Sequence, residues 1–144
     1  MATEAIDYTG TMQWKHGSTW YRVVGDLKSK MTPAVVLHGG PGAPHNYVLG
    51  IVHLLASTGR PVIVYDQIGS GQSTHLKDKP SEFWSVDLFK EELNLILKEL
   101  KVSKKYILVG QSWGGILSFA HAVDRPKGLK GLIIANSLAS VPKW

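Results

Sequence analysis

The segment Lys105–Gly115, with the sequence KYILVGQSWGG, constrains the fold of this chain more than any other. A short apolar run leads into the pattern G-x-S-x-G, and Gly115–Val123 then carries apolar side chains at helical spacing. A serine between a strand and a helix in this pattern is typical of a nucleophile elbow, where it sits on strained backbone. A side chain at either flanking glycine would collide with the neighbouring strand or helix. The bare pattern also arises by chance, but this context makes Ser112 the candidate nucleophile.

A second apolar run, Pro33–Leu37, opens into His38–Gly42, a loop made almost wholly of small residues. Acyl transfer needs backbone N–H groups that point at the negative oxygen of a tetrahedral intermediate, and glycines let the main chain approach that oxygen closely. The N–H of the residue after the nucleophile, Trp113, is one expected donor, and the loop after the third strand supplies the other. We assign this second donor to Gly40. Taken alone, the same loop is equally compatible with an ordinary Gly-Pro turn between a strand and a helix.

A third segment, Pro61–Thr74, lies between the other two and contains the sequence YDQIGSGQS after an apolar run. Gly69 and Gly71 after a strand resemble the start of a dinucleotide-binding fingerprint. The position where that fingerprint needs its third glycine is Thr74, however, and no helix-like pattern opens there. The dinucleotide interpretation is therefore disfavoured.

The order HGGPG, YDQIGSGQS and GQSWGG resembles the proline iminopeptidase (prolyl aminopeptidase) family of α/β-hydrolases. The resemblance runs from about Tyr21 to the last residue, and HGGPG is much more specific than G-x-S-x-G. It implies the N-terminal half of an α/β-hydrolase fold, a mostly parallel sheet with flanking helices, and a serine that forms an acyl-enzyme. In that family the middle segment braces the site, so Asp66 and Gln67 are expected to make structural hydrogen bonds.

The resemblance also implies a catalytic acid and a histidine that follow the nucleophile in the sequence. One acid, Asp124, and one histidine, His121, follow Ser112. Both lie in or at the end of the helix that starts at the elbow, which carries them away from the serine, and their order is reversed. They are expected to be surface or packing residues. Because His38 belongs to the oxyanion loop and the other histidines precede the elbow without a motif, the sequence offers no acid and no base for Ser112.

The C-terminal segment indicates a truncated chain. Leu129–Ser137 has the pattern of a buried parallel strand, and residues 138–144 resemble the segment where these enzymes enter a helical cap domain. We therefore expect residues 1–144 to form one incomplete α/β-hydrolase domain without the cap and without the C-terminal part that holds the catalytic Asp and His. Residues 132–135 should then form an unpaired apolar edge. Such a chain is expected to aggregate, to form an oligomer, or to need a complementing C-terminal half.

The remaining pattern predicts further elements of an α/β fold. Two alternating segments, 12–15 and 19–25, predict a short antiparallel pair of strands. Residues 46–57 predict a helix, and residues 86–100 predict a second helix with one apolar stripe and Ser85 as its N-cap. The apolar positions of the first helix are Tyr47, Ile51, Leu54 and Leu55. Strands that alternate with helices favour a parallel sheet.

Composition narrows the class of protein. Hydrophobic residues make up 44% of the chain, which is enough for the core of one domain. Neither a transmembrane run nor a signal peptide pattern is present, so a cytoplasmic location is expected and no membrane partner. The absence of cysteine excludes thiol catalysis, and no metal-binding spacing of histidines is found, so we expect no metal and no cofactor. The net charge of +5 comes from scattered lysines without interleaved aromatic residues, and no nucleic-acid partner is expected.

The sequence thus favours a serine hydrolase of the proline iminopeptidase or amino-acid amidase type. If completed, it would cleave an N-terminal aminoacyl or amide bond in a small peptide, or in an amino-acid amide or ester. Ser112 would attack the carbonyl carbon, and Gly40 and Trp113 would hold the oxyanion. The Trp113 side chain is a candidate wall of an acyl pocket, whereas Trp20 and Trp84 are expected to pack in the core or at an edge. Two alternatives stay open, an inactive remnant or interaction domain on the same scaffold, and an esterase.

Overall fold

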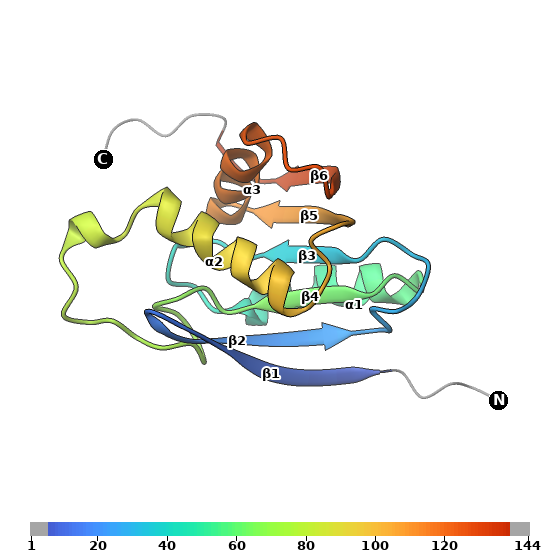
Figure 1. Cartoon of the computed structure of the whole chain (residues 1–144), viewed down its shortest axis with the longest axis horizontal. Coiled ribbons are helices and arrows are strands. Elements are labelled where there is room, and N and C mark those ends of the chain that lie inside the picture. Colours follow the sequence, from blue (N-terminus) through green and yellow to red (C-terminus); the bar gives the residue numbers. More distant parts are fainter. Residues whose placement is uncertain (1–5, 139–144) are drawn as a thin grey trace.

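Six strands form a single sheet in the order β1-β2-β4-β3-β5-β6, with helices on both faces (Figure 1). The computed structural model describes residues 6–138. The strands are β1 (Asp7–Trp14), β2 (Gly17–Val24), β3 (Ala34–Leu37), β4 (Val62–Tyr65), β5 (Tyr106–Gln111) and β6 (Leu129–Ala135). The helices are α1 (Leu49–Ser57), α2 (Val86–Glu99) and α3 (Trp113–Val123), with 3-10 turns η1 (His45–Val48) and η2 (Ser81–Phe83).

The sheet is antiparallel at one end and parallel over the rest. The hairpin partners β1 and β2 are antiparallel, and β2 is antiparallel to β4. From β4 through β3 and β5 to β6 all neighbours are parallel. The expected α/β architecture, a mostly parallel sheet with flanking helices, is therefore confirmed, and so is the expected antiparallel pair near the N-terminus.

Two apolar layers hold the sheet between the helices. The strands β3 and β4 have the sequences AVVL and VIVY and are buried at every position, as expected for parallel strands covered on both faces. One core layer packs these strands against α2 and α3, with Phe89, Leu93 and Leu117 at its centre. The other layer packs the opposite face of the sheet against η1 through Val48 and against α1 through Val52.

The first predicted helix differs from the expectation. Its first turn is the 3-10 turn η1, and α1 begins only at Leu49. Val48 and Val52 face the core, whereas Tyr47 and Leu54, two of the expected apolar positions, are 52% and 68% exposed. A 3-10 turn has three residues per turn, so it changes the phase of the helix that follows and therefore which side chains point inward.

The second predicted helix is confirmed as α2. The Ser85 hydroxyl accepts a hydrogen bond from the Leu88 N–H at 3.2 Å, which is the expected N-cap interaction. Phe89, Leu93 and Ile96 of the predicted stripe are buried. The same face also buries a carboxylate, Glu92, which the apolar stripe did not predict.

The central strands place two loops at one point. The strands β3 and β5 are neighbours, and Leu37 at the end of β3 is paired with Gly110 of β5. After β3 the chain turns toward α1 on one face of the sheet, and after β5 it turns toward α3 on the other face (Figure 1). A crevice at the carboxyl ends of neighbouring strands whose connections diverge in this way is where open α/β sheets bind ligands. The HGGPG loop and the G-x-S-x-G turn both open into this crevice.

The outer edge of the sheet at β6 is apolar and unpaired. Within residues 6–138, β6 has a strand partner, β5, on one side only. Leu132, Ile133 and Ile134 are 36%, 50% and 44% exposed, and Phe119 on the outer surface of α3 is 54% exposed. An exposed apolar strand edge without proline is a template for pairing with other chains.

We therefore expect the purified chain to self-associate through β6. Changing Ile133 to lysine places a charge in the middle of the edge and should shift the chain toward monomer in sedimentation velocity experiments over a range of concentrations. Leu54→Lys is the matched control, because it removes an exposed leucine from α1 and leaves β6 unchanged. A wild-type chain that is a monodisperse monomer at every concentration would contradict this expectation.

No helix within residues 6–138 has the length and apolar character that crossing a membrane requires. The expected cytoplasmic location stays a prediction.

Candidate active site

Ser112 occupies the turn between β5 and α3, as the sequence pattern predicts. Its φ of +54° and ψ of −122° are unusual for a residue with a side chain. Two backbone hydrogen bonds hold Ser112 in this conformation. The Ser112 N–H donates to the Ala135 carbonyl at 3.0 Å, and the Ser112 carbonyl accepts from the Gly115 N–H at 2.9 Å. Strained backbone at a serine between a strand and a helix is the geometry of a nucleophile elbow.

The glycines around Ser112 are required by close backbone approach. A Cβ atom on Gly110 would lie 2.2 Å from the Gly114 carbonyl oxygen in α3. A Cβ atom on Gly114 would lie 2.1 Å from the Leu37 carbonyl oxygen in β3. Both collisions are of the kind the sequence predicts, one with the helix and one with the neighbouring strand.

The HGGPG loop, residues 38–42, lies against Ser112. A Cβ atom on Gly39 would lie 3.0 Å from the Ser112 Cβ, so the loop and the elbow are in direct contact. Gly40 has a φ of +117°, a conformation that favours glycine. Among the hydrogen bonds between residues 6–138, none uses the Gly40 N–H or the Trp113 N–H. Both predicted oxyanion donors therefore remain available to a ligand, and their role stays a prediction.

The His38 ring is neutral, and both of its nitrogens are engaged by backbone groups, so it does not serve as a base for Ser112. Its side chain is buried, the Gln67 N–H donates to its Nε2 at 2.9 Å, and its Nδ1 lies 2.8 Å from the Gly39 carbonyl oxygen. A backbone N–H can only donate, so Nε2 accepts and Nδ1 carries the proton. Burial lowers the pKa of His38, which also favours the neutral form. The structure agrees with the expectation that His38 belongs to the loop rather than to a triad.

Asp66 and Gln67 make structural hydrogen bonds, as expected. The Gln67 amide donates to the His38 carbonyl at 2.9 Å and accepts from the Trp113 indole N–H at 2.9 Å. The buried Asp66 carboxylate accepts from the His45 N–H at 2.8 Å and from the Gln72 N–H at 2.9 Å, and its Oδ1 lies 2.9 Å from the His45 ring Nδ1. The segment after β4 thus braces the oxyanion loop against the elbow.

Glu92 is a site-supporting residue that sequence reasoning missed. Its carboxylate accepts from the Thr19 hydroxyl at 2.5 Å and from the Ile68 N–H at 2.8 Å, which ties α2 to β2 and to the segment after β4. Burial raises the pKa of Glu92 to about 7. A signal was present in the sequence, because Glu92 lies three residues after Phe89 and so on the apolar face of its helix.

The residues after the elbow do not supply an acid and a base. His121 is buried and its Nε2 lies 2.6 Å from the Tyr106 hydroxyl, and Asp124 forms an exposed ion pair with Lys90 at 2.6 Å. They are packing and surface residues, as expected. All six histidines of the chain lie within the described residues, and none of them hydrogen-bonds Ser112.

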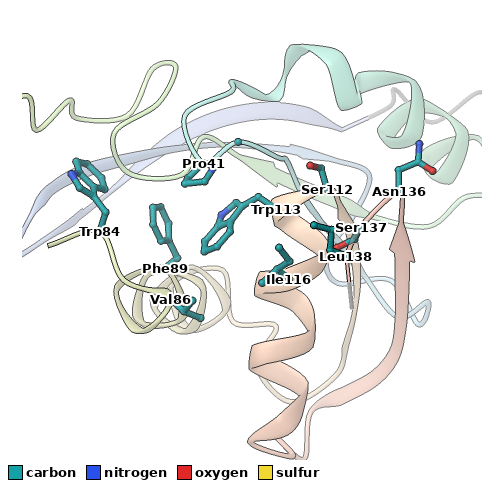
Figure 2. A pocket seen from close by; sticks show the side chains of 11 residues that line it. Pro41, Trp84, Val86, Phe89, Ser112, Trp113, Ile116, Asn136, Ser137 and Leu138 are labelled. Atoms are coloured by element: carbon teal, nitrogen blue, oxygen red, sulfur yellow. The ribbon is translucent and has the colours of Figure 1, made fainter. Parts of the chain in front are cut away.

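An apolar cavity of about 590 Å³ begins beside Ser112. Figure 2 shows Trp84, Phe89 and Trp113 in a row that leads toward Ser112 at the start of α3. Ile116 of α3 and Leu138 after β6 complete its apolar wall, and none of the described residues that line it carries a charge. Trp113 lines the cavity, as expected. Trp84, which was expected only to pack, also lines it, because the aromatic stack of Trp84 on Phe89 places both rings at the cavity surface.

The chain is similar in sequence to known proteins. Residues 32–144 match the model of the α/β hydrolase fold family. The proline iminopeptidase of Lactiplantibacillus plantarum is 44% identical over 127 residues, which cover 88% of this chain and 43% of that enzyme.

Solved structures give the same result for the fold. The crystal structure of the Mycobacterium smegmatis proline iminopeptidase superposes with a TM-score of 0.86 at 44% identity, and that of VinJ superposes with a TM-score of 0.89 at 50% identity. Each match covers 92% of this chain and 45% of the other chain. The chain therefore spans less than half the length of these relatives.

Proposed function

The chain belongs to the α/β-hydrolase fold family, and on this basis we propose that it supplies the nucleophile and the oxyanion hole of a serine hydrolase of the proline iminopeptidase type. One observation carries the proposal. Ser112 sits on a strained turn in direct contact with the HGGPG loop, where the Gly40 and Trp113 N–H groups have no acceptor among the described residues. The full activity, the substrate and the partners of the longer relatives are part of this proposal.

The proposed chemistry is an acyl transfer through Ser112. The Ser112 Oγ attacks the carbonyl carbon of an aminoacyl amide, its proton passes to a base, and the carbonyl oxygen becomes negative. The Gly40 and Trp113 N–H groups stabilise that oxygen, the amine leaves with a proton, and water then hydrolyses the acyl-enzyme. Because no histidine within residues 6–138 hydrogen-bonds Ser112, we propose that the base and its acid partner come from another polypeptide segment.

The cavity supports an apolar acyl group. Its lining is mostly aromatic and aliphatic, its polar side chains Ser112, Asn136 and Ser137 are uncharged, and a charged acyl side chain would lose its hydration there without gaining an oppositely charged partner. The cavity opens directly beside the nucleophile, which is where the acyl part of an acyl-enzyme must sit.

A second candidate function is a non-catalytic interaction domain on the same scaffold. The observation that favours it is the absence, within residues 6–138, of a histidine and an acid in reach of Ser112. The exposed β6 edge provides a surface on which such a domain would bind another chain.

A chimera distinguishes the two functions. The segment of the Lactiplantibacillus plantarum proline iminopeptidase that matches this chain, 43% of that enzyme, is replaced by this chain, and the rest of that enzyme is kept. We expect the folded chimera to hydrolyse a prolyl arylamide, and Ser112→Ala to reduce its kcat by roughly 10⁴-fold or more. Ser103→Ala, a change of an exposed serine far from the elbow, is the matched control. A chimera that folds, as judged by circular dichroism, but shows no turnover that depends on Ser112 would favour the interaction domain.

A further inference from the structure

The hydroxyl group of Tyr47 connects the oxyanion loop to the nucleophile elbow. It accepts a hydrogen bond from the Gly39 N–H at 2.5 Å and donates one to the Gln111 Oε1 at 2.6 Å. A phenol can do both at once, because it has one O–H donor and free lone pairs. Tyr47 lies in η1, so this bridge comes from a third element of the fold.

The two residues that Tyr47 joins are the immediate neighbours of the groups proposed to react. Gly39 precedes Gly40, whose N–H is a proposed oxyanion donor, and Gln111 precedes Ser112, the proposed nucleophile. A Cβ atom on Gly39 would lie 2.6 Å from the Tyr47 hydroxyl and 3.2 Å from the Gln111 Oε1, so the three groups are in contact. A shift of this bridge would change the distance between the nucleophile and the oxyanion donor.

This bridge is the exposed counterpart of a buried one. On the buried side, Gln67 joins the same two segments by bonding the His38 carbonyl and the Trp113 indole. On the exposed side, Tyr47 is 52% exposed and makes its bonds at the mouth of the site. Because Tyr47 contributes little to the core, its two hydrogen bonds are better explained by a role at the site than by a role in folding.

We propose that Tyr47 is a positioning residue that clamps the oxyanion loop onto the nucleophile elbow and so fixes the spacing of Gly40 and Ser112. The proposal rests on the proposed function of Ser112. Oxyanion donors stabilise a transition state only when they are held in place before the reaction, and a clamp of two hydrogen bonds supplies that rigidity.

The first test measures the clamp without any chemistry at Ser112. In the full chain labelled with ¹⁵N, Tyr47→Phe should move the Gly39 amide proton to lower frequency and speed its exchange with solvent, because the amide loses its acceptor. Gln111→Leu should have a smaller effect in the same direction, since Tyr47 keeps its bond to Gly39 but loses its own acceptor. Tyr8→Phe, on an exposed tyrosine of β1, is the matched control and should leave the Gly39 amide unchanged. An unchanged Gly39 amide in Tyr47→Phe would overturn the proposal.

The second test measures the spacing of the reacting groups. An aryl boronic acid forms a tetrahedral adduct with a nucleophilic serine, and its oxygen occupies the place of the oxyanion. We expect Tyr47→Phe to weaken the affinity for the boronic acid by roughly three- to tenfold, which corresponds to the loss of one hydrogen bond. The urea midpoint of unfolding should stay close to that of the wild type. The effects of Tyr47→Phe and Gln111→Leu should not add, because both remove the same clamp.

The outcomes separate the two proposals. Additive effects of Tyr47→Phe and Gln111→Leu, or equal adduct affinity in Tyr47→Phe and the wild type, would overturn the positioning role of Tyr47. The adduct is measured in the chimera described above, whose second part supplies a base, with and without Tyr47→Phe. A chimera that folds but forms no adduct would contradict the proposed function of Ser112. In that case the Gly39 amide would still show whether Tyr47 joins the two segments.

Discussion

The chain by itself is expected to hydrolyse a prolyl arylamide at no more than a trace rate. Ser112 and the two proposed oxyanion donors are in place, but none of the described histidines hydrogen-bonds the serine. A serine hydrolase without its base retains roughly 10³- to 10⁴-fold acceleration over water from the oxyanion hole and binding. Complete enzymes commonly turn over at about 1 to 10³ per second, which is far faster than the rate that remains without the base.

The measurement is release of the arylamine by the purified chain, with Ser112→Ala prepared in parallel to identify contaminating hydrolases. Turnover at the rate of a complete enzyme that disappears in Ser112→Ala would contradict the expectation. It would mean that a histidine of this chain, or of a second copy, reaches the serine.

The change of Gly114 to alanine is expected to prevent stable folding. A Cβ atom there would lie 2.1 Å from the Leu37 carbonyl oxygen and 2.8 Å from that of His38. Both atoms belong to the backbone at the end of β3, which pairs with β4 on one side and β5 on the other and so cannot move away. The cost should exceed about 4 kcal/mol, a large fraction of a total stability of roughly 5 to 15 kcal/mol. Intrinsic helix propensity alone predicts the opposite, since alanine is better than glycine inside a helix by about 1 kcal/mol.

Urea unfolding followed by circular dichroism checks this prediction. Gly50→Ala is the matched control, because Gly50 lies in α1 and a Cβ atom there meets nothing within 4 Å. We expect Gly50→Ala to keep or raise the urea midpoint, and Gly114→Ala to show no cooperative transition. An unchanged midpoint in Gly114→Ala would show that α3 lies farther from β3 than the structure has it.

Much of the fold could be predicted because the signals are local. The apolar runs of β3, β4 and β5 lie next to glycine-rich loops, and Ser85 marks the start of α2, so short windows of sequence define these elements. The order of the three motifs along the chain identified the family resemblance, and the resemblance predicted how the strands are arranged. No single window of sequence contains that information. The positions of Ser112 and of the HGGPG loop followed from these elements, because the carboxyl ends of parallel strands share one edge of the sheet.

The parts that could not be predicted depend on contacts between distant segments. Tyr47 looks like an apolar helix position in the sequence, and only the 3-10 turn η1 turns its hydroxyl toward Gly39 and Gln111. Glu92 looks like a polar interruption of a helix face. Its buried role depends on Thr19 and Ile68, which are 73 and 24 residues away in the sequence. Side-chain hydrogen bonds of this kind leave no periodic pattern.

Because Gly114 packs closely on β3, the position of Ser112 and the shape of the cavity depend on different residues. Ser112 is held by backbone hydrogen bonds to Ala135 and Gly115 and by the close backbone contacts of Gly110 and Gly114. The cavity wall includes the side chains of Trp84 and Ile116, which take no part in those contacts, whereas Phe89 lines the cavity and also belongs to the core. Substitutions of Trp84 and Ile116 can therefore change the shape of the cavity while the backbone around Ser112 is kept, whereas a side chain at Gly110 or Gly114 would collide with that backbone.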